Sequence, residues 1–138
     1  MKKLINTSMI YFILAMVAGV FYREFTKLQQ FTEQTTLSVL HTHLLILGMV
    51  MFLIIAIFGH LNHQFIEEKN FKRFYVLYNI ALPLMTIMML VRGIFQVLNT
   101  PLTLAMNASI SGIAGVSHIL ITIAFFMLFS ALKKSFVK

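Results

Sequence analysis

The sequence contains no cysteine. This excludes disulfide bonds, thiolate metal ligands and haem attached through thioether links. A metal inside this chain would therefore need histidine, methionine, carboxylate or backbone ligands. The ten methionines show no recognisable copper-binding spacing, so we expect them to serve as adaptable packing residues.

Charged residues are also scarce, because they make up 11 % of the chain and only four of them are acidic. Glu67 and Glu68 are neighbours in the most charged segment, where they predict a solvated loop and not an acid–base pair. The sequence shows no glycine-rich phosphate loop, no nucleophile–base arrangement and no internal repeat. It therefore gives no positive indication of an enzyme.

Apolar residues, by contrast, reach 59 % and the mean hydropathy is +0.90. These values are typical of integral membrane proteins. Four apolar runs are each long enough to cross a bilayer, which takes about 20 residues as a helix. The sequence predicts an all-α, four-helix up-down membrane bundle over residues 1–138, with spans at about 4–22, 37–59, 74–98 and 109–132.

The segments between these runs are short. Residues 28–36 predict a polar connection, residues 60–73 a loop or surface helix, and residues 102–108 a loop after Pro101. The first run has the charge-then-apolar shape of a signal peptide, but we expect it to be retained as a span. Pro83 lies inside the third run and predicts a kink there.

The basic residues lie at the ends of the apolar runs, so the net charge of +7 indicates membrane orientation and not nucleic-acid binding. Most of them fall on one side of the predicted bundle: Lys2, Lys3, Lys69, Lys72, Arg73, Lys133, Lys134 and Lys138. The other side holds only Arg23, Lys27 and Arg92. The positive-inside rule then predicts that both termini are cytoplasmic.

Histidines inside membrane spans are functional candidates, because an ionisable side chain is costly there. His41 and His43 open the second run and point to nearly opposite sides of a helix. At 1.5 Å per residue, His43 lies about 7 Å, His118 about 5 Å and His41 about 10 Å outside the middle of its span. His43 and His118 therefore match best in depth.

The fourth run offers a slot beside His118. Ser111 and Gly115 share its helical face, and small residues there leave room for a flat macrocycle between helices. Imidazoles could then act as axial ligands of haem iron. Arg92, with Arg23 above it, lies on the same outer side and could pair with haem propionates.

Two other interpretations use the same residues. Small residues and histidines in membrane helices often serve only close packing and interhelical hydrogen bonds. Alternatively, the histidines could pass a transition metal or a proton, helped by Asn79 and the Pro83 kink. The residue pattern alone leaves all three interpretations open.

The segment 41–48, His-Thr-His-Leu-Leu-Ile-Leu-Gly, resembles the haem-bearing helices of haem-copper oxidase and nitric oxide reductase large subunits. One such helix has a His-Thr-Asn-Leu motif whose first histidine binds the low-spin haem, which would implicate His41. Another has a His-x-His pair that binds two haems on opposite faces, which would implicate His41 and His43. The chain has no copper-ligand set, so the resemblance does not imply reduction of oxygen or nitric oxide.

Over its full length the chain resembles a family of small, uncharacterised four-span bacterial membrane proteins. The matching stretches are residues 22–27, 41–49, 92–93 with Gln96, and 109–118. This resemblance implies a multi-pass protein of the bacterial cell membrane and supplies no activity.

Together these observations predict a membrane protein that binds one b-type haem near the outer face. His118 and either His41 or His43 would be the axial ligands, and we favour His43 on depth. The expected role is electron transfer, or sensing and handling of haem, with a membrane redox partner or a second copy of the chain as partner.

Overall fold

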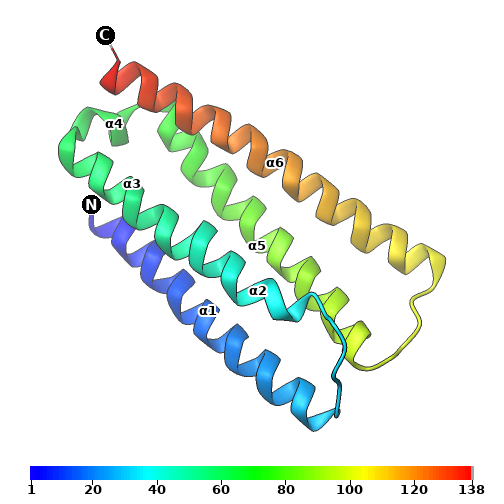
Figure 1. Ribbon diagram of the computed structural model, residues 1–138. Coiled ribbons are helices and arrows are strands. Elements are labelled where there is room, and N and C mark those ends of the chain that lie inside the picture. The colour runs from blue at the N-terminus through cyan, green and yellow to red at the C-terminus, as the bar shows by residue number, and fades with distance from the viewer. Residues whose placement is uncertain (138) are drawn as a thin grey trace.

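Four long helical segments form an antiparallel bundle in the computed structural model, which describes residues 1–137 (Figure 1). α1 spans Lys2–Leu28. The second segment is continuous but divides into α2 (Leu37–His43), the π-helix η1 (Leu44–Val50) and α3 (Met51–Leu61). A short α4 (His63–Glu67) leads into α5 (Lys69–Val97), and α6 spans Leu104–Phe136. No strand occurs within residues 1–137.

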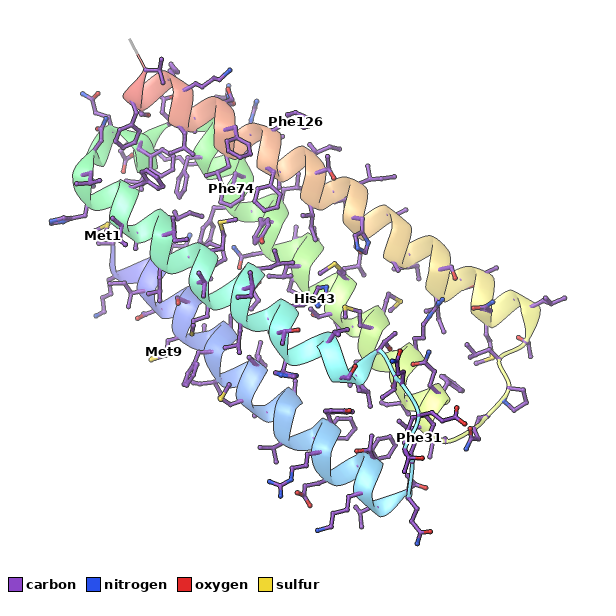
Figure 2. All side chains as sticks on the ribbon, in the orientation of Figure 1. Met1, Met9, Phe31, His43, Phe74 and Phe126 are labelled. Carbon is purple, nitrogen blue, oxygen red and sulfur yellow. The ribbon has the colours of Figure 1, made fainter. Side chains whose placement is uncertain are left out.

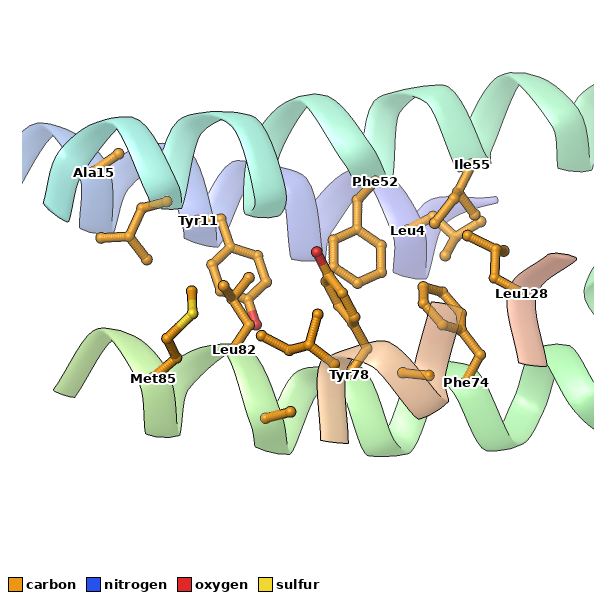
Figure 3. Packing of buried hydrophobic residues seen from close by; sticks show 14 of the residues in the cluster. Leu4, Tyr11, Ala15, Phe52, Ile55, Phe74, Tyr78, Leu82, Met85 and Leu128 are labelled. Atoms are coloured by element: carbon orange, nitrogen blue, oxygen red, sulfur yellow. The ribbon is translucent and has the colours of Figure 1, made fainter. Parts of the chain in front are cut away.

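The bundle core is aromatic and lies between the α1–α3 pair and the α5–α6 pair (Figure 3). Phe52, Phe74 and Tyr78 are fully buried there. Phe52 stacks on Tyr11 and meets the edge of Tyr78, with ring centroids 5.8 and 5.9 Å apart. Such aromatic pairs add to the apolar area that packing removes from the surroundings.

The outer faces of the helices are apolar as well. Val17, Val20 and Phe126 are 61, 64 and 72 % exposed, and Figure 2 shows Phe126 pointing away from the bundle. All four long segments are long and apolar enough to cross a membrane. An apolar exterior over a packed interior is the arrangement that suits a multi-pass membrane protein.

Both termini lie at the end of the bundle that carries α4 (Figure 1). At this end Met1 approaches Gly59, and Asn62 Nδ2 donates to Ser135 O at 2.8 Å. The basic residues that were predicted for the side of the termini lie at this end, apart from Lys138, which is outside the described residues. The structure thus agrees with the predicted topology of an even number of helices with both ends on one side.

The four predicted spans all correspond to helices, but the helices extend beyond several predicted boundaries. The expectation of a loop over residues 102–108 is wrong from Leu104 onward, because α6 already begins there. Thr103 caps this helix by accepting a hydrogen bond from Met106 N at 3.2 Å. α5 continues as one helix through Pro83, and the Thr86 hydroxyl donates to Leu82 O and Pro83 O.

Candidate functional site

A groove opens between the halves of α5 and α6 that lie away from the chain termini, with the start of α2 at its edge. Its volume is about 300 Å³, at the lower end of the range for ligand pockets. The groove is lined by Thr36 immediately before α2, by Met88, Met89 and Arg92 from α5, and by Ile110, Ser111, Ala114, Gly115 and His118 from α6. It therefore brings together three of the residues predicted from sequence on α6 and the arginine predicted on the third span.

The α6 wall of this groove is open because its glycines have no neighbour. A Cβ atom added at Gly112 or Gly115 would meet nothing within 4 Å. Gly48 and Gly93 differ, since a Cβ there would lie 2.5 Å from Tyr11 and Leu37 respectively. Gly112 and Gly115 thus do not serve close helix packing within the described residues, whereas Gly48 and Gly93 do.

His118 projects from the open face of α6. Its Nδ1 lies 2.7 Å from Ala114 O, the carbonyl four residues earlier. Because a carbonyl only accepts, Nδ1 carries a proton, and in the neutral ring Nε2 then has a lone pair for a metal. A histidine whose other ring nitrogen is held by a backbone carbonyl is oriented as a metal ligand commonly is.

His43 is held in the same way, with Nδ1 2.8 Å from Val39 O. Thr36 lines the groove, and His43 follows it by seven residues, two turns later on the same face of α2. Figure 2 shows His43 on the side of α2 that faces α5. His43 and His118 therefore share one tautomer, each with a free Nε2.

The antiparallel register also relates the two histidines in depth. Thr36 Oγ1 donates to Met89 O at 2.8 Å, and an Arg92 guanidinium N–H donates to Ser111 Oγ at 2.7 Å. His43 follows Thr36 by seven residues, and His118 follows Ser111 by seven. Because α5 runs in the opposite direction, the residues of α5 level with them lie seven positions before Met89 and Arg92, at 82 and 85. These two positions differ by less than one helical turn.

His41 points in a different direction. Its Cβ lies 3.7 Å from the position a Cβ would take at Gly19 of α1. Its Nδ1 is buried without a hydrogen-bond partner. Direction rather than depth thus separates the two histidines of the motif, because His41 packs on α1 and His43 does not.

Arg92 is half-buried at the end of the groove that lies away from the chain termini. It donates to Ser111 Oγ and, at 3.4 Å, to Asn107 Oδ1. The ion pairs found within residues 1–137 involve other residues, so its charge has no carboxylate partner in the described chain. Arg23 does not join it, since its side chain is 81 % exposed on α1 and its nearest carboxylate is Glu24 at 3.8 Å.

The π-helix η1 begins directly after His43 and was not predicted. A π turn is rare and is frequent at functional sites. Ser8 Oγ donates to Met49 O and Tyr78 Oη to Leu47 O, each at 2.9 Å, so α1 and α5 both bind carbonyls inside η1. These contacts hold η1 between α1 and α5.

The sequence interpretation missed Asn107 because it placed that residue in a loop. In the structure Asn107 lies on α6 one turn before Ser111 and on the same face. Asn79, considered for transport, accepts from Tyr11 Oη at 3.0 Å and donates to Tyr75 O at 2.8 Å. It therefore joins α1 to α5 and does not line the groove.

The described residues contain no group of three or more histidine and carboxylate side chains that could hold a metal ion.

Comparison with known proteins gives a family and no activity. No curated protein and no solved structure matches the chain. The likeness of segment 41–48 to oxidase helices therefore stays a resemblance of one helix. Residues 1–135 match the family described as "Protein of unknown function (DUF2871)", which is nearly the whole chain. The chain belongs to this family.

Proposed function

We propose that this protein crosses the bacterial cell membrane four times and holds one b-type haem beside the α5–α6 groove. His43 and His118 would be the axial ligands, and Arg92 would bind a propionate. The bound group would supply one-electron chemistry, so the role is electron transfer or the sensing and handling of haem.

One observation carries this proposal. His118 lines the groove, whereas His43 lies on α2 outside its lining; the register gives the two residues a similar position along α5, and each has Nδ1 bound to a backbone carbonyl. Bis-imidazole ligation needs this tautomer on both sides of one iron. The uncompensated charge of Arg92 at the outer end of the groove suits the carboxylates of a porphyrin.

The direct test is the absorption spectrum of detergent-purified protein, before and after addition of hemin. We expect a Soret band with the narrow visible bands of low-spin, six-coordinate haem on reduction. A protein that binds no hemin under either condition would refute the haem proposal. Binding of a transition metal ion by the same preparation would then favour the transport interpretation.

Arg92→Ala is expected to weaken haem retention by about tenfold or more, because a charge-assisted hydrogen bond contributes about 1.5–3 kcal/mol. The bundle should remain folded, as Arg92 contacts only two polar side chains of α6. Hemin titration with circular dichroism measures both quantities. Arg23→Ala is the matched control and should leave affinity unchanged; equal losses in the two variants would exclude a specific role for Arg92.

Gly115→Leu is expected to block haem binding without unfolding the protein. A side chain at this position enters open space inside the groove. Gly112→Leu is the control, because its side chain also meets open space but does not line the groove. Hemin titration should separate the two variants, and equal haem occupancy in both would contradict the proposed location.

The membrane orientation is proposed from the charge asymmetry of the two bundle ends. Reporters fused after residue 138 should show activity on the cytoplasmic side, and a reporter inserted in the 29–36 connection should show the opposite. Phosphatase and fluorescent-protein fusions at each position measure this. An external C-terminus would mean that the charge rule fails here.

A further inference from the structure

Two grooves lie along the seam between α1 and α5, and no histidine lines either of them. At the terminal end of the bundle, a groove of about 320 Å³ is lined mainly by apolar side chains together with Lys3 and Lys72. Farther along the same helices, a separate groove of about 570 Å³ is lined by Leu14, Ala18, Phe21, Pro83 and their neighbours.

The two grooves belong to one face of the helix pair. Lys3 and Leu14 are eleven residues apart on α1, and Lys72 and Pro83 are eleven apart on α5. Eleven residues make three helical turns, so each pair returns to the same side of its helix after about 16 Å. This distance is close to half of the ~30 Å hydrocarbon core of a bilayer.

The polar groups between the grooves already satisfy one another. Thr7 Oγ1 and Tyr75 Oη share a hydrogen bond of 2.7 Å, and Tyr11 Oη donates to Asn79. A ligand therefore does not need polar groups along the middle of the seam. An extended apolar chain suits it better than a peptide, which would bring its own backbone groups into the membrane.

The terminal groove differs in charge. Lys3 Nζ lies 4.2 Å above the ring of Tyr75 and has no carboxylate partner within the described residues. Lys72 bonds Glu67 at 2.7 Å, with both side chains about 60 % exposed. A cation held over an aromatic ring at the edge of an apolar groove is suited to an anionic headgroup.

We propose that this seam binds one anionic phospholipid of the leaflet on the terminal side. Its phosphate lies at Lys3 and Lys72, and one acyl chain follows the seam to the groove beside Leu14 and Pro83. This inference rests on the membrane-spanning part of the proposed function and is independent of haem.

Native mass spectrometry of the detergent-solubilised protein tests the headgroup end. Wild type should retain phosphatidylglycerol about tenfold more than phosphatidylcholine of the same chain length. Lys3→Gln/Lys72→Gln should reduce this preference to near unity. Lys69→Gln/Lys133→Gln removes the same charge outside the groove and should keep it. Equal retention of the two lipids by wild type, or equal loss in both double variants, would overturn the proposal.

The acyl end has its own test. Ala18→Phe fills the apolar groove and should lower retention of long-chain phosphatidylglycerol severalfold, without affecting a six-carbon analogue. If soluble glycerol phosphate displaces the long-chain lipid, the site binds the headgroup alone and the acyl chain does not bind along the seam. The hemin spectrum of both lysine double variants should stay that of wild type, so failure here is distinguishable from failure of the haem proposal.

Discussion

Replacing His43 or His118 with alanine is expected to abolish the low-spin haem spectrum, whereas His41→Ala should only perturb it. Both His43 and His118 present a free Nε2, while His41 packs against α1 at Gly19. Changing an outer partner of a metal ligand costs about 10- to 100-fold in affinity, so losing the ligand itself should cost more. Visible absorption and hemin titration of the three purified variants measure the effect.

Imidazole added to the His43 and His118 variants provides the control. A ligand cavity should accept free imidazole and recover part of the low-spin spectrum, which a misfolded protein would not do. Loss of haem in His41→Ala with an unaltered His43→Ala spectrum would instead favour the oxidase-like motif. The assignment based on side-chain direction would then be wrong.

Gly48→Ala is expected to lower the free energy of unfolding by about 1–3 kcal/mol, which is typical of overpacking a filled interior. The added Cβ would lie 2.5 Å from Tyr11 Cγ. The ring cannot move aside freely, because it stacks on Phe52 with planes 3° apart and its hydroxyl bonds Asn79. Gly93→Ala should behave alike, since its Cβ would approach Leu37 N to 2.9 Å.

Gly112→Ala is the matched control. Its Cβ meets nothing, and alanine is favoured over glycine within a helix by up to about 1 kcal/mol. Thermal unfolding of haem-free protein in detergent should therefore rank Gly112→Ala at or above wild type and Gly48→Ala well below it. A Gly48→Ala variant as stable as Gly112→Ala would show that α1 and η1 are not closely packed at this point.

The helical architecture could be predicted from the sequence because it depends on local composition. Four apolar runs of sufficient length have few alternatives to helices, since backbone groups in hydrocarbon must bond within their own segment. The grouping of both termini with the basic residues follows from an even number of such helices. Ser111, Gly115 and His118 share a face because helical spacing alone decides that.

The helix boundaries and the directions in which the histidine side chains point could not be predicted from composition and helical spacing. The start of α6 depends on a cap at Thr103, and the resulting extra turn brings Asn107 to Arg92. Helical spacing places His41 and His43 on opposite sides but does not say which side faces which neighbour. Only the packing of α2 on α1, through Gly19, assigns His41 to one side and His43 to the other.

The sequence by itself determined the number of long helical segments, their antiparallel order and the position of each ionisable residue along its helix, because length and hydrophobicity set these along one axis. Rotation about the helix axes was decided by the tertiary structure. Ser8 from α1 and Tyr78 from α5 bind carbonyls of η1, and a π turn changes the angle between the residues before and after it. These contacts join residues that are far apart in the chain, so no local sequence pattern predicts them.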